Sequence, residues 1–268
     1  MSLFNFSEPE LLTFFAILVR FSVLIAVLPF TGDKFVPMPA KILLSVAITF
    51  CMFPSLTKSG VVQTREALVW GSTTSGIAQT IGMETLFGLA MGYVAKLMFD
   101  AITFSASLVG TFMGFAMATT YDANAESQTQ VVSEFQLALA TLAFLALDGH
   151  HWMLKSALDS YATVGMGRAG IQQLTSQHLT QITGQVLSFG LQLAAPVAIL
   201  IFAINVAFGV MSKAMPQLNV LVLSFAVTSI VGLVVMGLGV PEFQGAVGEV
   251  FHRGVEWMDS MKGALAQK

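Results

Sequence analysis

Residues 110–122 have the sequence GTFMGFAMATTYD and lie between apolar segments, yet they would make a poor membrane span. Two glycines, two phenylalanines and two methionines fall within residues 110–117, ahead of the threonines and a charged end. Glycine permits irregular backbone, and methionine and phenylalanine side chains can repack around one another. The stretch could therefore form a pliable apolar obstruction inside a protein. The alternative is a helix end at which Gly110 and Gly114 allow a neighbouring helix to pack closely.

The composition of the whole chain is typical of a membrane protein. Of 268 residues, 55% are hydrophobic and 10% are charged, and the mean hydropathy is +0.78. Soluble domains carry about 25% charged residues, so this chain has too few charges to cover a water-facing surface. The net charge of −3 comes with no run of either sign, so we expect no nucleic-acid partner. We therefore predict an all-α integral membrane protein, or a component of a membrane assembly.

The N-terminal stretch and the cysteine content exclude further features. No positively charged stretch precedes the first apolar run, so we expect the first span to remain in the mature protein. Cys51 is the single cysteine, which excludes an internal disulfide and a cysteine-based metal site.

The apolar segments predict five to seven helices. Residues 42–53 and 135–147 form two short ones, and we expect Pro54 to end the first of them. Pro196 should kink a later helix. We expect residues 156–185 to lie outside the membrane and the tail from 241 to form a short amphipathic helix. The longer predicted helices cover residues 11–31, 67–95, 101–121, 186–211 and 220–239.

Charged residues lie within or beside these apolar segments. A charge at bilayer depth costs at least about 2.5 kcal/mol, so it usually faces a cavity or a partner. We favour ion pairs between helices over an ion pathway, because the charges form no repeated series. Lys96 and Asp100 are four residues apart and could pair across one turn. The embedded charges are Arg20, Glu84, Lys96, Asp100 and Asp148.

Two glycines share a helix face with one of these charges. Glu84, Gly88 and Gly92 are spaced by four, which places them on one side of a helix. Small residues at this spacing let another backbone approach, so we predict a helix-packing contact here.

Signs of catalysis are weak. Asp148, His150 and His151 could suggest a metal, but adjacent histidines on a helix point about 100° apart. No HExxH spacing, phosphate loop or nucleophile elbow is present in the sequence. We therefore expect neither an enzyme nor a metal or cofactor site.

Taken together and in order, several local patterns resemble the FliR family of flagellar export-gate proteins. Two positions depart from the family pattern. Ala123 follows Asp122 where family members often have proline, and Lys213-Ala214-Met215 stands where they often have arginine. The matching patterns are Arg20 with Leu28-Pro29-Phe30, Gly32 and Val36-Pro37; Glu84 with Gly88 and Gly92; the 110–122 stretch; Gly149-His150-His151 with Ser160; Ala195-Pro196-Val197, Asn205 and Gly209; and Met215-Pro216-Gln217-Leu218-Asn219-Val220.

This resemblance implies an architecture. Residues 1–185 would be a FliP-like helical region that includes a pore plug at about 106–122. Residues 186–240 would be a FliQ-like helical hairpin, and residues 241–268 an amphipathic tail. The turn of the hairpin would contain Lys213, Pro216, Gln217 and Asn219.

The resemblance also implies a function. The chain would join FliP-like and FliQ-like subunits, with FlhB-like and FlhA-like components, at the bacterial inner membrane in the flagellar basal body. Unfolded export substrates would pass through the pore, and membrane lipid would surround part of the assembly. Our hypothesis is that an apolar plug closes the resting pore. Its residues would be Gly110, Phe112, Met113, Gly114, Phe115 and Met117.

Two other functions remain open from the sequence. A secondary transporter would use the embedded charges and the helix broken at Pro196 around a midplane site. A purely structural membrane scaffold would tolerate polar residues in the Gly/Met/Phe stretch.

Overall fold

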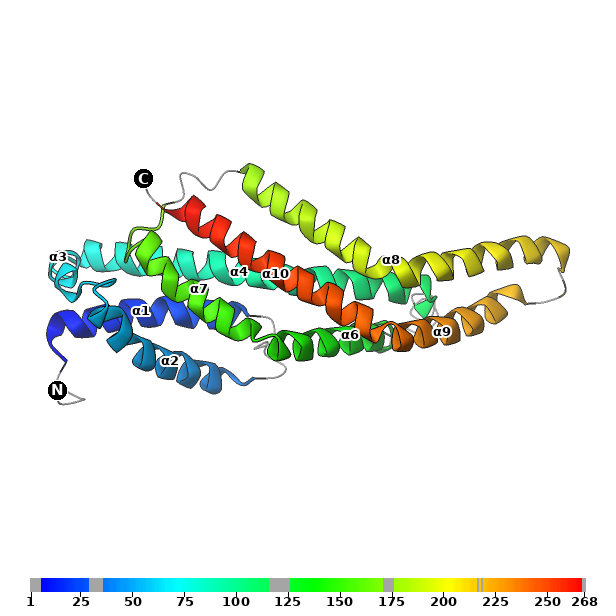
Figure 1. Ribbon diagram of the computed structural model, residues 1–268, viewed down its shortest axis with the longest axis horizontal. Coiled ribbons are helices and arrows are strands. Elements are labelled where there is room, and N and C mark those ends of the chain that lie inside the picture. Colours follow the sequence, from blue (N-terminus) through cyan, green and yellow to red (C-terminus); the bar gives the residue numbers. More distant parts are fainter. Residues whose placement is uncertain are drawn as a thin grey trace. The chain divides into compact units, whose positions relative to one another are not determined.

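The computed structural model (Figure 1) describes residues 6–28, 36–115, 126–170, 176–215, 217 and 219–266. These residues form helices joined by short connections, and an isolated bridge pairs Ala169 with Ala266. The predicted all-α class is therefore confirmed.

The first half of the chain begins with a capped helix, α1 (Glu8–Val27). Glu10 accepts a hydrogen bond of 2.8 Å from the backbone N–H of Ser7, and Pro9 occupies the first turn. The elements that follow are α2 (Met38–Lys58), the short 3₁₀ helix η2 (Thr64–Glu66), α3 (Ala67–Trp70) and α4 (Thr74–Phe112).

Helix α2 is longer than the sequence predicted. It continues past Pro54 to Lys58, so the expectation that Pro54 ends a short helix was wrong. A proline interrupts one backbone hydrogen bond and bends a helix without having to end it. Beyond the proline, the Thr57 hydroxyl adds a bond within the helix by donating to the Phe53 carbonyl at 2.9 Å.

The second half of the chain also has longer helices than expected. In place of the short apolar run at 135–147 the structure has a 21-residue helix, and in place of a short tail helix it has one of 26 residues. Pro196 lies inside α8, and Figure 1 shows this helix bending partway along its length. The helices are α6 (Glu126–Ala146), α7 (Gly149–Thr163), α8 (Ser176–Ala214), α9 (Val220–Leu238) and α10 (Val240–Leu265).

Among the described residues, 5 helices are long and apolar enough to cross a membrane, or up to 6 if α6 and α7 together form one broken span. The five are α1, α2, α4, α8 and α9. This number lies within the predicted range of five to seven.

The chain divides into two compact units, and α4, α8 and α10 each run from one unit into the other. Unit 1 comprises Met1–Leu97, Gly149–Gln181 and Arg253–Lys268, and unit 2 comprises Met98–Asp148 and Ile182–His252. These units interleave along the sequence, whereas the predicted regions 1–185, 186–240 and 241–268 are consecutive. The consecutive division rests on the family resemblance and stays a prediction.

Unit 1 is built around α1. The Phe53 ring of α2 packs edge-on against Phe14 of α1, with ring centroids 5.8 Å apart. On the α4 side, a side chain at Gly88 would begin 2.8 Å from the Arg20 carbonyl, and one at Gly92 would begin 2.8 Å from Cβ of Val27. The backbones of α1 and α4 can approach this closely only because both positions lack a side chain.

Unit 2 combines an aromatic cluster with an exposed hairpin. Phe99, Phe144 and Phe251 pack together, with centroid distances of 4.9 to 5.4 Å. Helices α8 and α9 form the hairpin, and only 17% of the apolar window of each is buried, compared with 61% for α4. Most of the hairpin's apolar surface is therefore available to lipid or to other proteins.

Candidate functional site

A buried ion pair lies at the centre of unit 1. Arg20 of α1 donates from Nε to Glu84 of α4 at 2.5 Å and from a terminal nitrogen to the other carboxylate oxygen at 3.0 Å. Both side chains are almost fully buried, at 1% and 0% exposure. This two-bond geometry is the strongest arrangement available to an arginine and a carboxylate.

Helix α7 and the turn after it complete the surroundings of this pair. Arg20 also donates to the Ser160 hydroxyl at 2.7 Å and to the Gly165 carbonyl at 3.1 Å. Glu84 accepts from the Gly167 backbone N–H at 2.8 Å and from the Tyr161 hydroxyl at 3.3 Å. The network therefore ties α1, α4, α7 and the turn at 165–167 to one point.

Two aromatic rings enclose the guanidinium group. Its central carbon lies 4.2 Å from the ring centre of Phe87 and 3.7 Å from that of Tyr161. Contact between a cation and an aromatic face adds to the stabilisation of the buried charge. The Glu84 carboxylate, the Ser160 hydroxyl, the Gly165 carbonyl and the two rings surround Arg20, so its guanidinium group ties the elements of unit 1 together and is not free to bind a travelling ion.

Sequence reasoning named Arg20 and Glu84 without indicating that they pair, and it missed Phe87, Tyr161, Gly165 and Gly167 as members of the network. The turn at 165–167 contained a usable signal. Gly165 and Gly167 have positive φ values of 68° and 66°, which the Gly-x-Gly spacing favours. For the other predicted pair, Lys96 and Asp100, the structure assigns the two residues to different units, and their pairing stays a prediction.

The Gly/Met/Phe stretch begins as the last turn of α4, in unit 2. Gly110 and Phe112 lie within the regular helix, whereas Gly114 follows its end with a φ of +90°. Phe112 and Phe115 are half-buried, and Met113 is fully buried. Met117, together with the rest of 116–122, lies outside the described residues.

The hairpin contacts the described part of this stretch. Thr228 of α9 lies with its hydroxyl oxygen 3.1 Å from the Met113 carbonyl, and the Asn205 amide of α8 donates to the Phe112 carbonyl at 3.3 Å. Phe115 packs edge-on against Phe225 of α9 at a centroid distance of 6.0 Å. Met113 also joins an apolar cluster with Val109, Val132, Ala194, Val197, Ile201 and Met236.

The predicted hairpin turn is described in part. Lys213 is exposed in the last turn of α8, Gln217 is exposed, and Asn219 caps α9 by accepting a hydrogen bond of 3.4 Å from the Val222 N–H. Pro216 lies outside the described residues.

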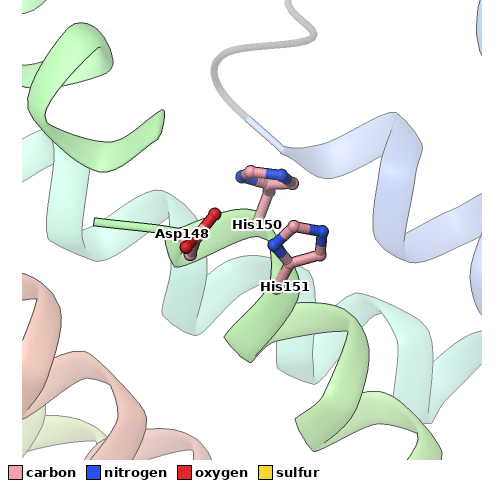
Figure 2. A group of neighbouring side chains, drawn as sticks. All are labelled: Asp148, His150 and His151. Atoms are coloured by element: carbon pink, nitrogen blue, oxygen red, sulfur yellow. The ribbon is translucent and has the colours of Figure 1, made fainter. Parts of the chain in front are cut away.

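Figure 2 shows the histidines at the start of α7 together with Asp148. The rings of His150 and His151 stack with centroids 4.1 Å apart and an interplanar angle of 37°. Asp148 ends unit 2, whereas both histidines belong to unit 1. The two rings therefore lie together and do not point apart, so the sequence argument from their adjacency was wrong, and the expected absence of a metal site stays a prediction.

Comparisons with known proteins give a consistent result. The family described as bacterial export proteins, family 1, matches residues 11–254. Similar proteins include the flagellar biosynthetic protein FliR of Pectobacterium carotovorum subsp. carotovorum, 32% identical over 85% of this chain and 84% of the relative. FliR of Escherichia coli K12 is 28% identical over 84% of this chain and 82% of its own length. FliR of Bacillus subtilis 168 is 22% identical over 92% and 93% respectively.

These matches cover nearly the whole chain, and they confirm the resemblance to FliR. The names of these relatives describe biosynthetic proteins and not enzymes. The chain belongs to the bacterial export proteins, family 1.

Proposed function

We propose that this chain is a subunit of the flagellar protein export gate, in which it completes a helical pore and supplies the apolar segment that closes it. The family match and the names of the FliR relatives support a role in flagellar export. The five span-capable helices support a location in a membrane. The bacterial inner membrane, at the flagellar basal body, is the location that this function requires.

The large apolar surface of the hairpin supports assembly with other subunits. Ile199, Val210 and Leu238 are among its exposed side chains, at 68%, 68% and 76% exposure. Exposed apolar side chains of this kind fit lipid or further apolar helices. We propose FliP-like and FliQ-like subunits as the ring partners, with FlhB-like and FlhA-like components at the same apparatus.

The observation that carries the proposed closing role is the junction between α4 and the hairpin. A helix of 39 residues ends in a run of glycine, methionine and phenylalanine, and α8 and α9 hold that end at Phe112 and Met113. Phe112 and Phe115 remain half-buried beside it. Side chains in such positions can complete an apolar seal with neighbouring subunits.

The proposed seal acts by excluding water. A constriction lined by Phe112, Phe115 and Met117 would block ions because an apolar channel dewets. Flexible methionine side chains would allow the seal to part around an unfolded substrate and to close again behind it.

The embedded charges favour this reading over a secondary transporter. Arg20 and Glu84 bind each other and four further polar groups, so they are poorly placed to release and rebind an ion. A structural scaffold without a gate is the remaining alternative, and an experiment must distinguish it from the proposed gate.

The test is to replace Phe112, Phe115 and Met117 together with serine in the full-length chain. Ion leakage across the membrane and secretion of flagellar proteins are then measured in cells that carry only this copy. We expect leakage to rise while the complex still assembles. In a matched control, serine replaces Leu142 and Leu145, which are exposed at 64% and 45% on α6, and leakage should stay low. Unchanged leakage in the triple variant, with normal assembly, would leave the scaffold as the better account.

A further inference from the structure

We propose that a cavity in unit 2 binds the headgroup of an aminophospholipid, and that Gln136 accepts a hydrogen bond from the ammonium group of that lipid. The cavity has a volume of about 330 Å³, and every residue that lines it belongs to unit 2. The inference requires only that the chain lies in a membrane, so it stands apart from the proposed closing role.

The walls of the cavity are largely apolar. Helices α6, α8, α9 and α10 all contribute to them. Val197 and Met236, each 8% exposed, connect the lining to the apolar cluster around Met113. Ligand sites have this character, with apolar walls, a few polar groups and a volume of about 300–1,000 Å³.

Gln136 provides the main evidence for a ligand. Its side chain is 5% exposed, and its Oε1 accepts no hydrogen bond among the described residues. A buried carbonyl oxygen without a donor costs free energy, and native proteins rarely leave one unpaired. Because Gln136 lines the cavity, a bound group can supply the missing donor.

Further acceptors lie in the walls formed by α8 and α10. Pro196 has no N–H, so it cannot donate to the Gln192 carbonyl one turn earlier in α8. Glu242, in the first turn of α10, adds a carboxylate to the lining. The cavity therefore offers acceptors and a negative charge, which a ligand with N–H donors and a positive charge complements.

The charge of unit 2 also favours a cation. The described residues that line the cavity include no lysine or arginine. In the sequence of unit 2, Lys213 is the only lysine or arginine, and it lies about 25 Å beyond Pro196 along α8. Glu134 and Glu249, exposed on α6 and α10, add negative charge to the same helices. An ammonium group therefore meets attraction and no nearby competitor from unit 2.

The position of the cavity along the hairpin fits a lipid headgroup. Gly239 and Val240 line it, and they directly follow α9. The 19 residues of α9 form about 28 Å of helix, close to the hydrocarbon thickness of about 30 Å. The end of such a span lies at the headgroup level. The acyl chains would then lie against the exposed apolar surface of the hairpin, and the phosphate would stay in water.

The first experiment compares two headgroups of equal charge. The purified full-length chain in detergent is titrated with phosphatidylethanolamine and with phosphatidylcholine of the same acyl chains, and bound lipid is measured by native mass spectrometry. The ammonium group of the first lipid has three N–H donors, and the trimethylammonium group of the second has none. We expect phosphatidylethanolamine to bind about 10-fold more tightly, as for one hydrogen bond between a charged donor and a buried acceptor. Equal affinity, or no binding of either lipid, would overturn the proposal and leave water to occupy the cavity.

Variants of the lining separate the hydrogen bond from the charge. Gln136→Leu removes the acceptor, so the preference for phosphatidylethanolamine should disappear. Glu242→Gln removes the negative charge and should weaken both lipids, because both headgroups carry a positive charge. Gln244→Leu and Glu249→Gln are the matched controls, exposed on α10 and outside the lining, and should change neither affinity. A preference that survives in Gln136→Leu, or that Gln244→Leu abolishes equally, would overturn the assigned site.

A labelling experiment locates the lipid. Ala246→Cys, in the lining, and Gly245→Cys, beside it with open space around its Cβ, are each combined with Cys51→Ser. Each full-length variant is placed in vesicles of phosphatidylethanolamine or of phosphatidylcholine, and the rate of maleimide labelling is measured. Labelling at 246 should be several-fold slower in phosphatidylethanolamine, and labelling at 245 should be the same in both. If position 246 is protected only when other subunits are present, and equally in both lipids, a partner's side chain occupies the cavity and the lipid proposal fails.

Discussion

At the centre of unit 1 an arginine and a glutamate hold each other with directional bonds, whereas at the centre of unit 2 an apolar cluster surrounds Met113. The first arrangement has named partners at fixed distances and is costly to disturb. The second depends on shape, on bare glycine positions and on flexible methionine, all of which adapt more readily. We therefore expect substitutions at the centre of unit 1 to cost more stability than substitutions in unit 2.

The largest effect should come from breaking the buried ion pair. Glu84→Gln leaves Arg20 charged, at 1% exposure, without its carboxylate, which typically costs about 3–5 kcal/mol of stability. We expect a large fall in the thermal midpoint of the purified protein and in the amount that accumulates in the membrane. The control is Arg253→Ala, which removes an exposed pair with Glu256 worth about 0–1 kcal/mol.

A double variant sharpens this result. Arg20→Met combined with Glu84→Gln removes the stranded charge, so it should be less destabilised than Glu84→Gln alone. If the double variant is the less stable of the two, the pair does not act as a charge-balanced unit.

A smaller loss should follow from filling the helix contact of unit 1. Gly88→Ala places a Cβ 2.8 Å from the Arg20 carbonyl and 3.0 Å from Cβ of Val23, so α1 and α4 must separate. Overpacking of this kind costs about 1–3 kcal/mol, measurable by thermal or chemical unfolding in detergent. Gly82→Ala is the matched control on α4, since nothing lies within 4 Å of its Cβ, and it should be neutral or stabilising. Equal losses in the two variants would contradict close packing at Gly88.

Next in size should be Tyr161→Phe. This change keeps the ring that lies 3.7 Å from the Arg20 guanidinium and removes the hydroxyl that donates to Glu84 at 3.3 Å. A single hydrogen bond contributes about 0.5–1.5 kcal/mol, and one to a charged group somewhat more, so the loss should be modest. A comparison of the free energies of unfolding of Tyr161→Phe and Glu84→Gln would show whether the phenol or the carboxylate contributes more to the stability of the network.

The smallest effect should occur in unit 2. The side-chain oxygen of Gln136 is buried without a hydrogen-bond partner in the part of the chain that the structure describes. Gln136→Leu removes that unsatisfied group, so stability should stay equal or rise slightly, as read from the thermal midpoint. A loss as large as that of Tyr161→Phe would show that polar contacts matter as much in unit 2 as in unit 1.

Local patterns predicted much of this structure, and long-range pairing escaped them. Gly88 and Gly92 stand out in the sequence because their spacing is readable along one helix. Arg20 and Glu84 are 64 residues apart, and Tyr161 lies a further 77 residues on, so nothing in a single sequence indicates that they meet. The length of α2 was misjudged because proline was taken to end a helix that continues past it to Lys58.

The contacts of the Gly/Met/Phe stretch also could not be predicted from the sequence. Its glycines and methionines suggested pliability, and the sequence alone could not show that the hairpin holds Met113 through Thr228 and Gly232. These contacts join residues more than a hundred positions apart, and they depend on where a neighbouring helix has no side chain.

The most direct test of the account is to place a photo-cross-linking amino acid at Phe115 and irradiate cells in which an export substrate has been stalled in passage. The account predicts a cross-link between the substrate and position 115, and none from Phe87, which is 0% exposed in unit 1. Absence of the cross-link at 115, in a complex that assembles and holds the stalled substrate, would contradict passage of the substrate past this segment.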